Sequence, residues 1–200
     1  MKRLLWALVA LLTFSSCELE PYPQYYKSIT IENIAFSHEL ESITASDALT
    51  VSATITNYYG KGYVGVRYWV CNNTWGEELP HLKIENNTLY EWVEPQGEEV
   101  EGKWNKLASI KTTYDYHCNG KNENDESCGY VGKLKPSACP SCGGKDFKAK
   151  TVEFAPDKPF AFEAAIPKQS KGKVVFFDIH AASEYGILTD SKLYHYTVQP

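Results

Sequence analysis

Cysteines are the residues of this chain whose type and spacing predict chemistry. Nine residues separate Cys118 from Cys128, ten separate Cys128 from Cys139, and two separate Cys139 from Cys142. A Cys-x-x-Cys turn directs two sulfurs at one point, and Gly143 directly after it lets the backbone fold back and donate N–H groups to sulfur. Because four thiolates bind Zn²⁺ tetrahedrally at about 2.3 Å, the spacing predicts one tetrathiolate metal site.

The sequence from the second of these cysteines onward, residues 128–147, reads CGYVGKLKPSACPSCGGKDF. It resembles the rubredoxin-like domains of rubrerythrins and related zinc ribbons. The matching residues are Cys128-Gly129-Tyr130-Val131, Pro136, Cys139-Pro140, Cys142-Gly143 and Phe147. The resemblance implies a zinc ribbon inserted over residues 117–147, with zinc as its metal. The alternative that it implies is iron and electron transfer, as in true rubredoxins.

The first half of the insert departs from the rubredoxin-like pattern. Its cysteines should be spaced Cys-x-x-Cys, but nine polar or glycine residues, 119–127, lie between Cys118 and Cys128. We expect these residues to bulge outward while both cysteines return to the metal. His117 is the adjacent competitor of Cys118 as a ligand.

Two other chemistries compete for the same cysteines. Two disulfides would be permitted in an oxidising compartment. A redox-active pair is the second alternative, because Cys139-Pro140-Ser141-Cys142 looks like a glutaredoxin motif. That chemistry needs the first cysteine at the N-terminus of a helix, which Gly143-Gly144 would break. The spacing favours zinc over both.

The start of the chain predicts export. Lys2 and Arg3 precede an apolar run of 11 residues, 4–14, which is shorter than the roughly 20 residues of a membrane-spanning helix. A basic start, a short apolar core and a small-residue exit are typical of a secretory signal peptide, here residues 1–16. The exit, Phe14-Ser15-Ser16-Cys17, resembles the lipobox of bacterial lipoproteins, with Phe14 in place of the usual aliphatic residue.

The lipobox resemblance implies that Cys17 is lipidated, as with palmitate, and becomes the new N-terminus. The protein would then be anchored to a membrane of the cell envelope, on the periplasmic or surface side of the outer membrane. Residues 17–27 form the expected tether, and Glu18 and Glu20 resemble the surface-export signals of Bacteroidetes lipoproteins. The alternative is an ordinary signal peptide cleaved elsewhere, which leaves Cys17 a free thiol.

Charge limits the partners of the mature chain. Removal of residues 1–16 takes away Lys2 and Arg3, which leaves 18 basic and 25 acidic residues, a net charge of −7. This balance argues against nucleic acid as a partner.

Hydrophobic residues alternate with period two along most of the chain, which predicts strands. In residues 48–56, ALTVSATIT, Leu49, Val51, Ala53 and Ile55 share one face. The expected extended segments are residues 28–36, 48–56, 63–71, 82–84, 89–93, 104–116, 151–154, 160–166, 173–181 and 193–198. A turn is expected at 57–62, and a hairpin around Asn86-Asn87.

These segments predict an all-β protein, an antiparallel β-sandwich with the four-cysteine insert in its sequence. Residues 28–116 and 148–200 would form the sandwich. The closing stretch, VVFFDIHAASEYGILTDSKLYHYTV, resembles the last hairpin of immunoglobulin-like or fibronectin-like domains, with Val175, Phe177, Ile179 and Ala181 pointing inward.

No motif in the sequence indicates an enzyme. Cys71 ends an apolar strand and reads as a buried residue, and His180 and His195 are expected on outward faces where they could pair. Trp69, Trp75, Trp92 and Trp104 could line a sugar-binding face. We therefore expect a non-enzymatic lipoprotein in which the zinc insert supports binding to another envelope protein or to a glycan. The alternatives are an iron electron carrier and a glycan-binding lipoprotein that uses the tryptophans.

Overall fold

The computed structural model describes residues 29–56, 60–72, 75, 78–97, 101–113, 116–121, 123–132, 136–149, 152–154 and 158–200. These residues form an all-β protein built of antiparallel sheets, with one short 3₁₀ turn, η2 (Leu40–Ser42). The all-β prediction is therefore confirmed. The expected signal peptide, the tether and Cys17 lie outside the described residues.

The first large sheet has three strands in the order β1-β2-β12. Their bounds are Thr30–Phe36, Leu49–Thr56 and Phe160–Ile166. Strand β2 alternates buried and partly exposed residues along its whole length, and its buried side chains are those that the sequence placed on one face. The period-two pattern therefore predicted this strand and its orientation correctly.

The second large sheet is centred on the two longest strands, β3 (Gly60–Cys71) and β13 (Val174–Ser183), which pair along ten positions. Four shorter strands complete it: β11 (Val152–Phe154) and β7 (Lys111–Thr113) beside β3, and β14 (Leu188–Asp190) and β15 (Tyr194–Thr197) beside β13. Nine of the ten β13 residues are buried, because both faces of this strand are covered.

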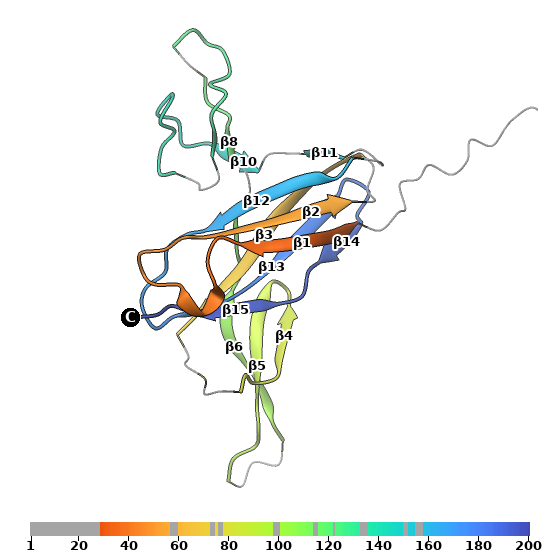
Figure 1. Cartoon of the computed structure of the whole chain (residues 1–200), viewed down its shortest axis with the longest axis vertical. Helices are drawn as coiled ribbons and strands as arrows, with labels where there is room; N and C mark the ends of the chain where they lie inside the picture. The colour runs from red at the N-terminus through yellow and green to blue at the C-terminus, as the bar shows by residue number, and fades with distance from the viewer. Residues whose placement is uncertain are drawn as a thin grey trace, which may run out of the picture.

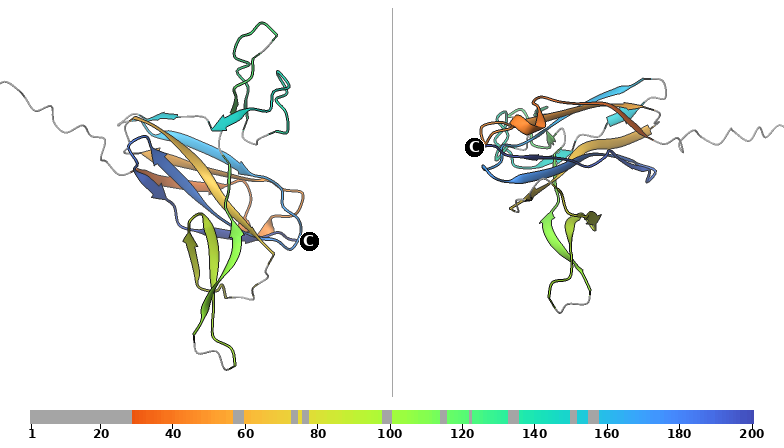
Figure 2. Two further views of the ribbon diagram at one scale, coloured as in Figure 1. Left: turned by 180° about the vertical axis from the view of Figure 1, so that it is seen from behind. Right: turned by 60° about the horizontal axis from the view of Figure 1, so that its bottom comes forward.

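The two large sheets form the layers of a sandwich with a common core (Figures 1 and 2). Val51 and Ile55 from the first sheet and Val66, Phe177 and Ile179 from the second are at most 1% exposed. Burying such side chains stabilises a fold by about 1.5–3 kcal/mol each. The expected inward direction of Phe177 and Ile179 is confirmed, whereas the immunoglobulin-like resemblance stays a prediction.

A third sheet, β4-β5-β6, extends from one side of the sandwich (Figure 1). Its strands are Leu82–Glu85, Thr88–Val93 and Lys103–Ser109. Asn86 and Asn87 both adopt positive φ between β4 and β5, so the predicted hairpin is present. We call this third sheet the arm. It is attached to the sandwich by a second hydrophobic cluster, which includes Leu89 from β5 and Trp69 and Phe176 from the second large sheet.

Several strand boundaries differ from the sequence prediction. Strand β3 begins at Gly60, inside the expected turn, because Gly60–Gly62 pair with β11. The extended stretch expected over 104–116 is divided among β6, β7 and β8, each in a different sheet. Strand β14 was not predicted, since its three residues are too few to show a period.

Candidate metal centre

A fourth sheet carries the cysteine-rich segment on the side of the sandwich opposite the arm (Figure 1). Its order is β10-β8-β9, with bounds Phe147–Ala149, Tyr116–Cys118 and Val131–Gly132. Cys118 ends the central strand and pairs with Phe147, and its N–H donates to the carbonyl oxygen of Tyr130 at 3.1 Å. We call residues 116–149 the cysteine module.

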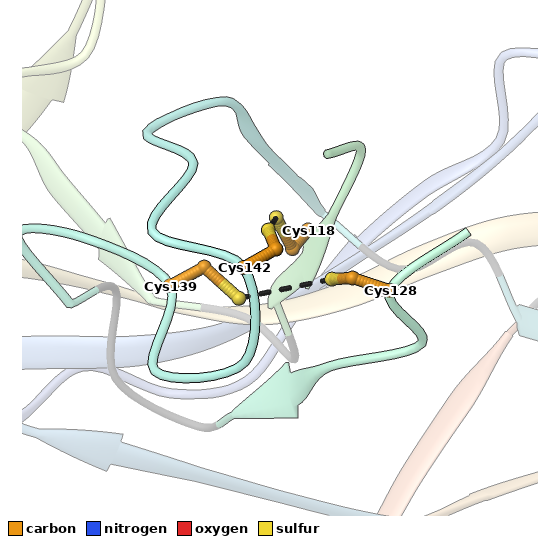
Figure 3. Close-up of side chains that lie close together, drawn as sticks. All are labelled: Cys118, Cys128, Cys139 and Cys142. Carbon is orange, nitrogen blue, oxygen red and sulfur yellow. Dashed lines mark hydrogen bonds between the residues drawn. The ribbon is translucent and has the colours of Figure 1, made fainter. Parts of the chain in front are cut away.

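The four sulfurs of the cysteine module converge on one point (Figure 3). Their Sγ atoms all lie within 4.8 Å of one another. The Sγ atoms of Cys118 and Cys142 lie 3.6 Å apart, and those of Cys128 and Cys139 lie 3.7 Å apart. Four thiolates at about 2.3 Å from a tetrahedral ion lie about 3.8 Å apart, so this group can hold a metal ion.

Local backbone geometry explains how Cys139 and Cys142 reach the same point. The N–H of Gly143 donates to the carbonyl oxygen of Cys139 at 2.7 Å, and the N–H of Cys139 donates to the carbonyl oxygen of Gly144 at 2.7 Å. Gly143 has φ +69°, a conformation that glycine adopts without steric cost. The turn therefore closes tightly and leaves both side chains on its inner side.

The first pair of cysteines reaches the same point despite the long gap between them. The N–H of Cys128 donates to the carbonyl oxygen of Gly120 at 3.1 Å, and Lys121 and Ser127 form an antiparallel bridge. Removing residues 121–127 from the sequence leaves Cys118-Asn119-Gly120-Cys128, a Cys-x-x-Cys motif. The extra residues are thus an insertion closed at its base, and Cys118 keeps the position of a ligand.

Two glycines hold the backbone against the sulfurs. A Cβ atom added to Gly120 would lie 2.7 Å from the Sγ of Cys142 and 3.2 Å from that of Cys118. At Gly144 the same two sulfurs would be 3.3 and 3.6 Å away. The backbone N–H of Gly120 donates to the Sγ of Cys118 at 3.2 Å. A side chain at Gly120 would therefore collide with the Cys142 sulfur, and one at Gly144 would touch it closely.

Burial and hydrogen bonds from backbone N–H groups have opposite effects on the pKa values of the cysteine thiols. Burial disfavours the thiolate of Cys139, but hydrogen bonds from the backbone of Ser141 and Cys142 outweigh it and lower its pKa to about 7. Burial raises the pKa of Cys118 to about 12, against the donor of Gly120. A dication favours thiolates strongly, so metal binding would draw all four groups into the charged form.

The rival chemistries do not match this geometry. All five cysteines in the described part of the chain are free, and a disulfide would need sulfurs about 2.05 Å apart. Cys139 lies at the start of a turn, whereas a glutaredoxin-like pair has its first cysteine at the N-terminus of a helix. His117 is adjacent to Cys118 in strand β8, so its side chain points to the opposite face.

Cys71 lies apart from the metal centre. It is fully buried in the second hydrophobic cluster. Burial, with a smaller effect of Glu91, raises its pKa to about 11. This thiol is an apolar core group, as the sequence indicated.

The expected pairing of His180 with His195 does not occur. Strand register places His180 opposite Asp190 and His195 opposite Phe176, because two different strands pair with successive halves of β13. The Nδ1 of His180 lies 2.6 Å from Asp190. Asp190 also accepts from Arg67, whose guanidinium holds the buried Asp178 at 2.5 and 2.9 Å. This ionic group escaped the sequence analysis because its members are far apart in the chain.

The four tryptophans do not share one face. Trp69 is fully buried, and Trp75 packs edge-on against Phe176. Trp92 and Trp104 instead face each other across β5 and β6, with ring centroids 5.3 Å apart. The predicted sugar-binding set is therefore divided between the core and the arm.

Comparison with known proteins identifies no relative: no family model, no curated protein and no solved structure matches the chain. Within the described ranges, no helix has the length and apolarity needed to cross a bilayer. The class that the fold and the site define is an all-β protein with a four-cysteine group able to hold a metal ion.

Proposed function

We propose that the protein is a lipid-anchored, non-enzymatic binding or scaffold protein of the cell envelope, whose cysteine module is held together by one structural zinc ion. The convergence of four sulfurs at 3.6–4.8 Å carries the zinc part of the proposal. Four protein ligands fill a tetrahedral ion, as in structural zinc sites, whereas catalytic zinc keeps one position open for water or substrate.

The small size of the module supports a structural role for the metal. Its three strands have three, two and three residues, and Tyr130 and Phe147 form an edge-on ring contact within it at 6.3 Å. Segments of this length rarely fold on their own core and need a metal or a disulfide. Structural zinc contributes about 10–16 kcal/mol in small zinc peptides, enough to hold these loops.

Elemental analysis of the purified protein tests the metal and its identity together. We expect a colourless protein with one zinc per chain, and Cys139→Ser should lose the metal while the sandwich stays folded by circular dichroism. Cys71→Ser is the matched control and should keep full metal content. A red protein that bleaches on reduction would establish iron and the electron-carrier alternative. Stoichiometric metal in Cys139→Ser would contradict the site.

The proposed anchor rests on the sequence around Cys17. Its test is metabolic labelling with a fatty-acid analogue in a Gram-negative host. The wild-type chain should be labelled and recovered with membranes, whereas Cys17→Ser should be unlabelled. Equal labelling of both would overturn this part of the proposal without affecting the metal site.

A glycan is the second candidate partner, and the arm provides the observation that favours it. Trp92 and Trp104 occupy opposed register positions, as do Tyr90 and Lys106, so these side chains share one face of the arm. The Nζ of Lys83 lies 4.6 Å from the Trp104 ring, and Trp104 is 38% exposed. Aromatic rings beside polar groups suit the apolar and hydroxyl surfaces of sugars.

Affinity electrophoresis in gels that contain polysaccharides tests the arm. A retarded wild-type band that Trp104→Ala abolishes would support glycan binding. Tyr185→Ala removes an exposed aromatic residue of the sandwich and should leave the retardation unchanged. Equal mobility of the wild type with and without every polysaccharide tested would exclude this candidate.

A further inference from the structure

We infer that Cys142 and Cys128 are oxidation sites for hydrogen peroxide, and that Cys118 and Cys139 respectively resolve them into disulfides. The two disulfides would join the two halves of the module and expel its metal. This inference rests on the proposed metal site and adds a redox response to it.

Sulfur positions select the pairs. Sγ–Sγ contacts of 3.6 and 3.7 Å join Cys118 to Cys142 and Cys128 to Cys139. Both pairs cross between the two Cys-x-x-Cys-like turns (Figure 3). Forming a bond of about 2.05 Å from these positions requires each pair to close by roughly 1.6 Å, which side-chain rotation can supply.

The two cysteines of each pair differ in their exposure to solvent. Cys118 and Cys139 are buried, each 2% exposed, whereas Cys128 and Cys142 are partly accessible. Each close pair therefore contains one partly exposed cysteine and one buried cysteine. Because oxidation of a thiolate follows its exposure, attack begins at Cys128 or Cys142. The buried neighbour, whose sulfur lies 3.6 or 3.7 Å away, then supplies the thiolate that meets the new sulfenic acid.

The chemistry balances without a further reactant. An exposed thiolate attacks one peroxide oxygen, the O–O bond breaks, and a sulfenic acid and hydroxide form. The buried thiolate attacks the sulfenic sulfur, the S–S bond forms, and a second hydroxide leaves. Two peroxides thus convert four thiolates into two disulfides and four hydroxides. A disulfide sulfur is a poor ligand compared with a thiolate, so the metal dissociates as a dication.

Trypsin separates disulfides across the turns from disulfides within them. Cleavage after Lys111, Lys121, Lys133 and Lys145 gives peptides 112–121, 122–133 and 134–145. The first holds Cys118, the second holds Cys128, and the third holds both Cys139 and Cys142. Disulfides across the turns therefore link all three peptides into one species. Disulfides within the turns would instead join 112–121 to 122–133 and leave 134–145 bridged internally.

The experiment titrates the metal-loaded full chain with peroxide, follows released zinc with a chromogenic chelator, and maps peptides by mass spectrometry. We expect one zinc released per two peroxides and the three-peptide species. Fragmentation of this species between Cys139 and Cys142 identifies the partners, because 112–121 should be attached to Cys142 and 122–133 to Cys139. Cys71→Ser should behave as wild type.

Three outcomes would overturn the inference: disulfides within the turns, sulfinic acids in place of disulfides, or metal retained at excess peroxide. Protein that carries no metal before peroxide is added would contradict the proposed metal site instead. The two failures are therefore distinguishable in the same titration.

Discussion

Deleting residues 121–127 should preserve the metal site and tighten it. The deletion joins Gly120 to Cys128, whose N–H donates to the Gly120 carbonyl oxygen at 3.1 Å, so the two residues to be joined already lie side by side. It shortens the connection between Cys118 and Cys128 from ten residue steps to three. The entropic cost of closing this loop falls by about (3/2)RT ln(10/3), or about 1.1 kcal/mol. Metal affinity should therefore rise by about sixfold.

A second deletion provides the matched control. Removing residues 119–125 gives the same two-residue spacing but leaves Cys118-Glu126-Ser127-Cys128. Ser127 then occupies the place of Gly120, where a Cβ would lie 2.7 Å from the Sγ of Cys142. This variant should bind metal more weakly than the wild type.

Competition with a chromogenic zinc chelator measures both affinities on the same scale. The order expected is the 121–127 deletion first, the wild type second and the 119–125 deletion last. Loss of metal from the 121–127 deletion would refute the view that the extra residues are an insertion outside the site. Equal affinity of the two deletions would refute the role given to Gly120.

Three further predictions concern single residues. Gly120→Ala should weaken metal binding by about 5- to 150-fold, because overpacking costs about 1–3 kcal/mol. Its control is Ser141→Ala, which changes an exposed side chain of the same module and should match the wild type in the chelator assay. Arg67→Met leaves the buried Asp178 without its cation. It should lower the free energy of unfolding, measured in urea, by about 3–5 kcal/mol, and the double variant Arg67→Met/Asp178→Leu should recover part of the loss. Additive losses from the two substitutions would contradict the pairing. Cys71 should resist iodoacetamide at pH 8 until the protein unfolds. Because burial raises its pKa from 9.0 to about 11, its contribution to stability should be present below pH 9 and decline as pH rises toward 11; Cys71→Ala should lack this decline.

Periodicity predicted the strands that bury one regular face. Strand β2 alternates along all eight residues, so both its presence and its inward side chains followed from the sequence. Strand β12 was also predicted at its observed bounds, although only its first part alternates and its last three residues are all buried. Such segments need no knowledge of their partners, because the core lies on one side of them.

Periodicity could not predict the strands of two or three residues around the cysteines, and it could not predict which sheet a strand joins. The break of 104–116 into β6, β7 and β8 depends on which sheet each part joins, and a local pattern does not contain that information. The strands β8, β9 and β10 are held by pairing around the cysteines and carry no period of their own.

In the metal centre, too, the local part could be predicted from the sequence and the tertiary part could not. Cys139-x-x-Cys142-Gly143 indicated half of the site directly, since its turn is local. Cys118 was harder to assign because residues 121–127 conceal its spacing, and only the bridge of Lys121 with Ser127 shows that they form a closed insertion. The close approach of Gly120 to two sulfurs likewise depends on the tertiary structure and cannot be read from the local sequence. The group of Arg67, Asp178, His180 and Asp190 depends on register between β3, β13 and β14.

X-ray absorption at the zinc edge tests the central claim most directly. For the purified full chain we predict a first shell of four sulfurs at about 2.3 Å, contributed by Cys118, Cys128, Cys139 and Cys142. A shell with a nitrogen or oxygen scatterer, such as His117 in place of Cys118, or a protein that binds no zinc with its four thiols intact, would contradict it.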